Sequence, residues 1–263
     1  MYHNISNNAP NKGLNNEPNK GFNKSAKTYA QHADIQPIIA QFVASQAQQY
    51  LSEAELILDI GCGAGQLAQF LPNYHIIGVD AAENMCAISP APVICADALC
   101  LPFADATFNA AISSLCWQWL PLPLAAVELK RILQPNAVAI IALLSHGTMW
   151  ELHDVYLRAN IAPRLLDYYK SEQIAEIFKH HDFAIIAHHQ QQIVINHDCV
   201  WSFFQQLRLI GAHQASMLPP LNYGQLKQIM RIYEREFGLK NDINEVTNNI
   251  PVTYKFDCVV LGA

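Results

Sequence analysis

The chain has few charged side chains, and most of those it has are acidic. Charged residues make up 14% of its 263 residues, and 22 Asp and Glu outnumber 16 Lys and Arg, which gives a formal net charge of -6. A protein that binds nucleic acid through the phosphate backbone needs a basic face. We therefore expect no nucleic-acid partner.

Three further features are missing from the sequence. No apolar run is long enough to cross a bilayer, and the first residues lack the apolar segment of a secretory signal, so we expect a cytoplasmic protein without a membrane partner. No Cys-x-x-Cys pair occurs among the seven cysteines, which lie mostly in apolar runs as buried, reduced thiols do. The pairs His180–His181 and His188–His189 would face opposite sides of a strand, so we expect no metal site.

Apolar residues are abundant, at 51% of the chain. A globular chain of this length buries most of its apolar surface, and we expect it to fold alone as a monomer. Residues 1–22 differ, because they are rich in Asn and poor in apolar side chains. Such a segment cannot bury enough surface to become ordered, so we predict a disordered tail over 1–22 and a single domain over 23–263.

The stretch Leu56–Gly65 is the strongest local signal. An apolar run ends in Asp59 and three alternating glycines, Gly61, Gly63 and Gly65. This pattern is typical of a buried parallel strand that turns directly into a helix. Glycine lets the backbone approach a ligand closely, and the amides of the following helix point at the same place. The alternative is an ordinary turn between a strand and a helix.

The glycine spacing bears on which ligand is bound. A dinucleotide fingerprint reads Gly-x-Gly-x-x-Gly, whereas here the third glycine comes one residue early and Asp59 precedes the first. A carboxylate at that position repels a pyrophosphate and attracts a cation. The spacing therefore disfavours a nicotinamide-dependent dehydrogenase.

Two more acids follow predicted strands. Asp80 ends the run His75–Asp80, about 20 residues past the loop, where doubly wound folds hold a ribose diol. Asp97 follows a third run that begins at Val93. By itself Asp97 also fits a helix cap, but three acids at three successive strand ends indicate one shared site.

Helical patterns flank this region. Ile35, Ile39 and Val43 lie on one face of a predicted helix that Asp34 caps. Tyr29 and His32 precede it, either as a lid over the ligand or as part of a packing helix at the edge of the sheet. Further along the chain, 108–114 and 137–144 read as the fourth and fifth buried strands, and helix and strand signals alternate as in a parallel sheet.

Asp-x-Gly-x-Gly-x-Gly resembles the first motif of class I S-adenosylmethionine-dependent methyltransferases. The resemblance implies an α/β fold: a seven-stranded, mostly parallel Rossmann-like sheet with helices on both faces, with 183–195 and 251–261 as the last two strands and 196–250 as a helical cap over the substrate. It implies S-adenosylmethionine as cofactor and S-adenosylhomocysteine as product. The cofactor-binding residues so implied are His32, Asp59, Gly61, Cys62, Gly63, Gly65, Asp80, Ala81, Met85, Asp97, Ala98, Leu99 and Ser114.

Motifs outside the loop resemble a narrower family, the malonyl-acyl-carrier-protein O-methyltransferases of biotin synthesis. They are Tyr29-Ala-Gln-His32-Ala-Asp34, Trp117-Gln118-Trp119, Gly147-Thr-Met-Trp-Glu151-Leu152-His153, Leu207-Arg208-Leu-Ile210-Gly211-Ala212-His213 and Pro251-Val-Thr253-Tyr254. The chain departs from the family where Arg208 replaces the usual Lys and Ser114 the usual Asn. It also departs over Arg164–Tyr168, where the family usually has a segment similar to His-x-Asn-Arg-Phe.

The resemblance implies that the acceptor is the free carboxylate of a malonyl group on acyl carrier protein, which is acidic. Arg208 and Tyr254 are the predicted catalytic residues that hold this carboxylate, and Tyr29, Trp119 and His146 the predicted pocket lining. A surface ion pair for Arg208 and a core position for Tyr254 are the alternatives. Candidate carrier contacts are Arg158, Arg164, Lys170, Lys227, Arg231 and Arg235.

Two other functions fit the same residues. A methyltransferase for another small carboxylate or a quinone-like ring is one, and an acceptor hydroxyl would then make His146 a general base. A binding protein that keeps the fold without catalysis is the other, and the intact Asp59, Asp80 and Asp97 disfavour it.

Overall fold

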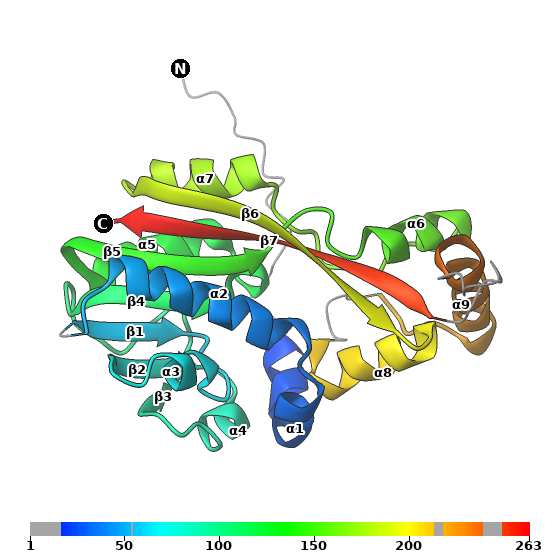
Figure 1. The fold of residues 1–263 in the computed structure, drawn as a ribbon, viewed down its shortest axis with the longest axis horizontal. Helices are drawn as coiled ribbons and strands as arrows, with labels where there is room; N and C mark the ends of the chain where they lie inside the picture. The colour runs from blue at the N-terminus through cyan, green and yellow to red at the C-terminus, as the bar shows by residue number, and fades with distance from the viewer. Residues whose placement is uncertain (1–16, 54, 213–217, 239–248) are drawn as a thin grey trace.

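The computed structural model describes residues 17–53, 55–212, 218–238 and 249–263, and a seven-stranded sheet organises them (Figure 1). The strand order is β3-β2-β1-β4-β5-β7-β6. The first five strands pair in parallel, and β7 runs antiparallel to both β5 and β6. The bounds are β1 Leu56–Ile60, β2 His75–Asp80, β3 Val93–Cys95, β4 Phe108–Ser114, β5 Leu133–Leu144, β6 Ala184–His197 and β7 Ile250–Gly262. The predicted α/β fold is confirmed.

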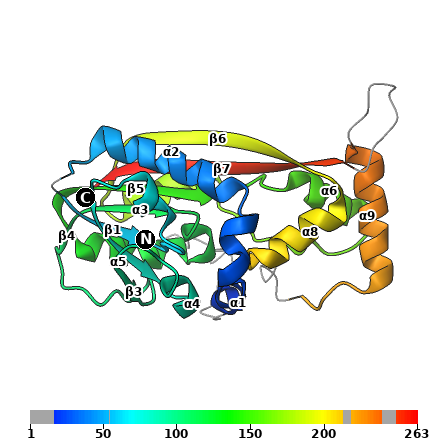
Figure 2. The ribbon, with the colours of Figure 1, turned by 60° about the horizontal axis from the view of Figure 1, so that its bottom comes forward.

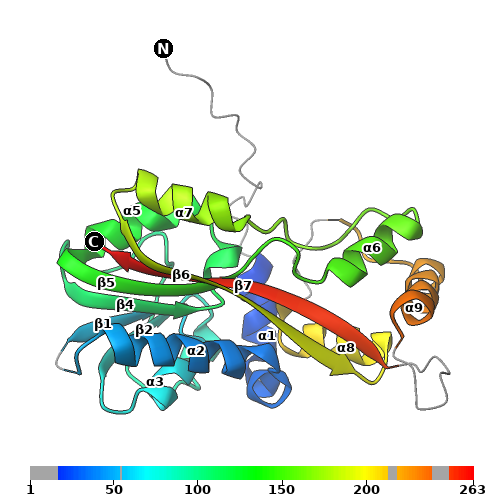
Figure 3. The same ribbon diagram turned by 45° about the horizontal axis from the view of Figure 1, so that its top comes forward.

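Helices cover both faces of this sheet, with α2 on one and α5 and α7 on the other (Figure 3). Neighbouring residues of β1 show why, because Ile57 packs into the core under α2 and Leu58 into the core under α5. The helix bounds are α1 Glu17–His32, α2 Ile35–Tyr50, α3 Gln66–Phe70, α4 Glu83–Cys86, α5 Leu122–Ile132, α6 Trp150–Arg158, α7 Ser171–His180, α8 Val200–Leu209 and α9 Tyr223–Phe237, with a 3-10 turn, η1, at Trp117–Trp119.

The last two strands continue past the rest of the sheet. β5 ends where Leu144 pairs with Phe256, whereas β7 and β6 stay paired as far as Ile250 and His197. Helices α6, α8 and α9 lie around this two-stranded extension, at the edge where the parallel strands end (Figures 1 and 2). The cap predicted over 196–250 therefore contains α8 and α9, while 213–217 and 239–248, including His213, lie outside the described residues.

The N-terminal boundary needs a correction. We predicted a disordered tail to residue 22, but α1 begins at Glu17; residues 1–16 lie outside the described part. Tertiary contacts explain the earlier start: the ring of Phe22 packs edge-on against Trp119, and the amide of Asn84 donates to the side chain of Asn23 at 2.8 Å. Composition carries no sign of such contacts.

Proline and glycine stand at two helix ends, whereas the cap predicted at Asp34 is wrong. Pro37 lies in the first turn of α2, and Gly211, with a φ of +82°, follows the end of α8. Asp34 stands before α2, but its side chain makes no capping hydrogen bond. Its backbone is already in the helical region, which turns the side chain away from the cap geometry.

The histidines of β6 point to opposite faces, as the strand period requires. His188 contacts Asp257 at 2.5 Å, whereas the ring of His189 packs against Phe42 of α2. Within the described residues, no group of three or more His, Cys, Asp or Glu is arranged to hold a metal, and no helix is long and apolar enough to cross a membrane.

Candidate functional site

A small pocket lies where β1 turns into α3. Its walls come from α1 and α2, the loop after β1, the start of α3, and the last residue of β4. Residues predicted to bind the cofactor or substrate are brought together there: Tyr29, Asp59, Gly61, Cys62, Gly63 and Ser114. This is the carboxyl edge of the sheet, where open α/β folds hold their ligands.

The loop glycines have positive φ values, but they serve different purposes. At Gly61 (φ +72°) a Cβ atom would lie 2.3 Å from Cβ of Cys116, so the glycine lets two chain segments touch. At Gly63 (φ +53°) a Cβ atom would meet nothing within 4 Å, so its open side faces the pocket. At Gly65 (φ +75°) it would crowd Ser89. Only Gly63 therefore leaves open space where we predicted a ligand.

Asp59 lies at the bottom of the pocket and is 1% exposed. Its Oδ1 atom has no hydrogen-bond partner among the described residues. Burial, and to a lesser degree the charge of Asp80, raises the pKa of Asp59 to about 8. A buried carboxyl without a partner favours its neutral form, and a bound cation would favour the charged form instead.

Gln36 of α2 lines the same pocket, and its Oε1 atom is also buried without a hydrogen-bond partner in the described structure. Neither Gln36 nor Ala40, which lies one turn further along α2, was predicted from the sequence. The available signal was a polar side chain one residue from the apolar stripe of a helix. Together with Asp59, Gln36 gives the pocket two acceptor oxygens that lack donors.

Asp80 ties the glycine loop to the end of β2. Its two carboxylate oxygens accept hydrogen bonds from the amides of Gly63 and Ala82, each at 2.8 Å. Burial raises the pKa of Asp80, and these two bonds partly oppose that shift. Each oxygen has a second lone pair, so the carboxylate keeps acceptor capacity for a ligand.

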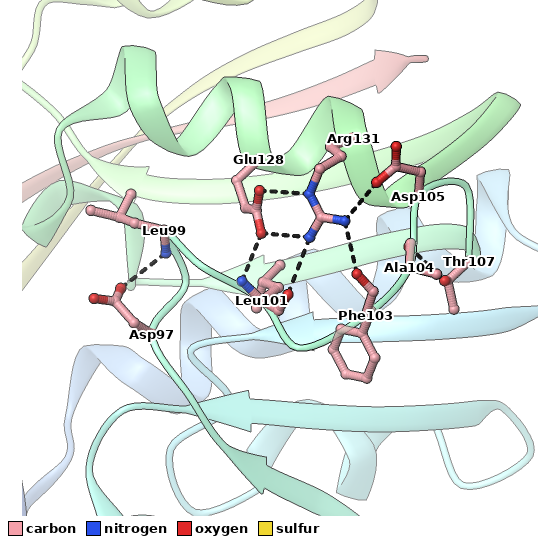
Figure 4. A network of polar contacts seen from close by, with 9 residues as sticks. All are labelled: Asp97, Leu99, Leu101, Phe103, Ala104, Asp105, Thr107, Glu128 and Arg131. Atoms are coloured by element: carbon pink, nitrogen blue, oxygen red, sulfur yellow. Dashed lines mark hydrogen bonds and ion pairs between the residues drawn. The ribbon is translucent and has the colours of Figure 1, made fainter.

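Asp97 is exposed, and its Oδ1 accepts a hydrogen bond from the amide of Leu99 at 2.9 Å, which closes a turn around Ala98 (Figure 4). Of the three acids, Asp59 lines the pocket, whereas Asp80 and Asp97 are not among its lining residues. Burial raises the pKa of the Cys116 thiol most, and the charges of Asp80, Asp59 and Asp97 raise it further. Cys116 lies two residues past the end of β4, at the same edge of the sheet as the three acids, which stand at or near the ends of β1, β2 and β3.

The segment after Asp97 is held by Arg131 of α5, which the sequence analysis did not identify (Figure 4). The guanidinium donates to both oxygens of Glu128, at 2.7 and 2.9 Å, and to Asp105 at 2.8 Å. It also donates to the carbonyl oxygens of Leu101 and Phe103. One side chain thereby fixes the course of the loop that follows β3.

Helix α1 closes the pocket from outside. Tyr29 lines it, and burial, then the charges of Asp80 and Cys116, raise the pKa of its phenol. Met85 of α4, 1% exposed, packs with Ala26 of α1, and Ala81 directly follows the end of β2. His32 does not line the pocket, and its carbonyl oxygen accepts from Gln206 of α8.

The predicted acceptor residues are spread over the cap and the edge of the sheet. Arg208 is exposed, on the face of α8 that it shares with Trp201 and Gln205, whereas Tyr254 is 4% exposed within the core. Burial raises the pKa of Tyr254 most, followed by the charges of Tyr168, Asp34 and Glu151. Trp119 is half-buried and His146 is exposed. The structure thus gives Arg208 and Tyr254 different surroundings.

Two of the quoted motifs do meet. Glu151 of α6, 2% exposed, accepts hydrogen bonds from the hydroxyl and the amide of Thr253 in β7. Trp150 donates to the same hydroxyl at 3.2 Å. This contact fastens α6 to the strand extension beside Tyr254.

Comparison with known proteins bears on the chemistry. A family model described as "Methyltransferase domain" matches residues 58–141, from β1 into β5. The malonyl-[acyl-carrier protein] O-methyltransferase of Marinomonas sp. (strain MWYL1) is 24% identical over 252 residues, which cover 90% of each chain. The biotin biosynthesis bifunctional protein BioHC of Saccharophagus degradans is 27% identical over 212 residues, 73% of this chain and 38% of that protein.

Among solved structures, a putative methyltransferase (BH2331) from Bacillus halodurans C-125 has a TM-score of 0.59 at 13% identity, covering 83% of this chain and 97% of that one. That likeness concerns the fold. The sequence matches and the methyltransferase domain go further and confirm the resemblance. The chain therefore contains a methyltransferase domain over residues 58–141 and is similar in sequence to the malonyl-[acyl-carrier protein] O-methyltransferases.

Proposed function

We propose that this chain transfers the methyl group of S-adenosylmethionine to the free carboxylate of malonyl-acyl carrier protein. The products are S-adenosylhomocysteine and a malonyl methyl ester that primes synthesis of the pimeloyl precursor of biotin. The observation that carries the proposal is the match, over 90% of both chains, to a malonyl-[acyl-carrier protein] O-methyltransferase. The pocket supplies the physical support.

The residues present fit S-adenosylmethionine. The unpartnered oxygens of Asp59 and Gln36 offer acceptors to a cationic amino-acid group, and the open side of Gly63 leaves room beside them. Asp80 would hold the ribose hydroxyls, and Asp97 with the amides that follow it would hold the adenine. When bound, S-adenosylmethionine supplies an electrophilic methyl group on a sulfonium.

The acceptor sets modest chemical demands. A malonyl carboxylate is ionised at neutral pH, so no side chain has to remove a proton. The chain has to orient this carboxylate and keep water away from it. Because its pKa is raised, the phenol of Tyr254 stays protonated and remains a hydrogen-bond donor to the acceptor. Tyr29 and Trp119 would supply apolar walls.

Mass measurement of the carrier tests the proposal. The enzyme is incubated with S-adenosylmethionine and either malonyl-carrier protein or acetyl-carrier protein, which lacks the free carboxylate. We expect a mass gain of one methylene on the malonyl form alone, and activity that shows no requirement for a base titrating near pH 7. Methylation of both carriers, or of neither, would contradict the proposal.

A further inference from the structure

Three exposed cations lie on two neighbouring helices, Lys24 and Lys27 of α1 and Arg208 of α8; we call them the α1–α8 basic patch. On α1 the lysines share a face that points away from the pocket, because Ala26 and Tyr29 occupy the opposite face. Arg208 lies on the exposed face of its own helix. All three side chains are therefore available to a partner in solution.

Backbone contacts join the two helices closely. The hydroxyl of Ser25 donates to the carbonyl oxygen of Arg208 at 3.2 Å, and that of Thr28 donates to the carbonyl oxygen of Leu209 at 2.8 Å. A Cβ atom on Gly211 would lie 2.7 Å from the backbone of Gly21. Since Lys24 directly precedes Ser25, Lys24 and Arg208 extend from adjacent points. Figure 2 shows α1 and α8 side by side.

The patch is not neutralised within the molecule. In the described structure no acidic side chain forms an ion pair with Lys24, Lys27 or Arg208. Helix α8 contains no acidic residue. Cations that repel one another on one surface are stabilised by an anionic partner, and here they provide a local attraction against the repulsion that a chain of net charge -6 exerts on an acidic protein.

Of the six cations predicted earlier for carrier binding, Lys170 is exposed just before α7, and three others already have partners within the molecule. Arg158 pairs with Asp154 and Glu236, and Arg235 pairs with Glu236 as well. Arg164 donates to the carbonyl oxygens of Pro219 and Ala162. The charges of Arg158 and Arg235 are paired, and the hydrogen-bond donors of Arg164 already have acceptors within the molecule. Exposed Lys227 and Arg231 remain on α9, around the far end of the strand extension (Figure 1).

We propose that the α1–α8 basic patch docks the acidic surface of acyl carrier protein; this inference rests on the proposed function. The patch lies on the outer side of the helix whose inner side contributes Tyr29 to the pocket. A carrier bound there stands next to the site its acyl arm has to reach. In this proposal Arg208 helps to dock the carrier, whereas the sequence predicted that it holds the malonyl carboxylate.

Two substrates separate docking from chemistry. Malonyl-carrier protein needs the patch, whereas malonyl-pantetheine carries the same carboxylate without protein or phosphate. For the variant Lys24→Glu/Lys27→Glu we expect kcat/KM with malonyl-carrier protein to fall about tenfold or more at low salt. The value with malonyl-pantetheine should stay at the wild-type level. The matched control, Lys227→Glu/Arg231→Glu, should leave both values unchanged.

Salt gives a second readout. Wild-type kcat/KM with malonyl-carrier protein should decrease as ionic strength rises, and the Lys24→Glu/Lys27→Glu variant should lose most of this dependence. Equal losses on both substrates, no loss on either, or a larger effect in the α9 control would overturn the docking proposal. If Arg208→Glu alone abolishes reaction with malonyl-pantetheine, Arg208 contacts the acceptor. If the wild-type enzyme methylates neither substrate, the proposed function itself is wrong.

Discussion

Asp59 combines deep burial, a raised pKa and an oxygen without a partner. Folding moves its pKa from 3.8 to about 8, so between these values the folded state binds more protons than the unfolded state. The free energy of unfolding of the ligand-free protein therefore falls as pH rises across this window. A residue kept for its ligand lowers the stability of the empty protein.

Replacing Asp59 by Asn tests this trade-off. The ligand-free variant should melt at a higher temperature than the wild type at pH 8, and the difference should shrink toward pH 5, where the wild-type carboxyl is protonated. Its affinity for S-adenosylmethionine should drop roughly tenfold or more, because a charge-assisted hydrogen bond is lost. Differential scanning fluorimetry and calorimetry give the two readouts. Parallel melting curves across this pH range would refute the assignment.

At the scale of elements, the glycine loop separates folding from binding. Gly61→Ala should reduce the free energy of unfolding by at least about 2 kcal/mol, since the new methyl group meets Cys116 at 2.3 Å and the φ is +72°. Gly63→Ala meets nothing within 4 Å and should lose only about 1 kcal/mol from its positive φ. Gly63→Ala should nevertheless weaken the binding of S-adenosylmethionine. Urea denaturation measures the stability loss of each variant, and calorimetry measures its affinity for S-adenosylmethionine. Equal stability losses would contradict this division.

The loop after β3 depends on α5 through one side chain. Arg131→Met leaves the carbonyl oxygens of Leu101 and Phe103 without their donor and should cost about 2 kcal/mol of stability. Asp105→Asn is the matched control, because Asp105 is exposed and its ion pair should contribute well under 1 kcal/mol. Urea denaturation compares the two. If both variants lose equally little, Arg131 does not hold this loop.

At the scale of the whole molecule, the parallel half of the fold could be read from the sequence. β2 and β4 have the predicted bounds, because each is a short, mostly apolar run that ends at a polar residue, Asp80 or Ser114. β6 and β7 begin and end within a few residues of their predicted positions. What the sequence did not indicate is how far these two strands extend beyond β5, since strand pairing is a non-local property.

The site divides in a similar way. Asp59, Gly61 and Gly63 follow from local backbone needs, and the structure brings them together. Gln36 was missed because its function depends on which side of α2 faces the glycine loop, and that is set by packing. The sequence left a surface position for Arg208 open for the same reason: spacing places residues on a helix face but does not say which face is buried.

Helix α1 is wedged between two neighbours, with Tyr29 turned to the pocket and with Ser25 and Thr28 bonded to α8. Because the same helix contacts both the pocket and α8, binding in the pocket and binding on the outer side of α1 are thermodynamically coupled. If a nucleoside bound in the pocket raises the affinity for a partner on the outer side of α1 by some factor, that partner raises the affinity for the nucleoside by the same factor. The order of arrival then alters the speed of assembly and leaves the free energy of the ternary complex unchanged.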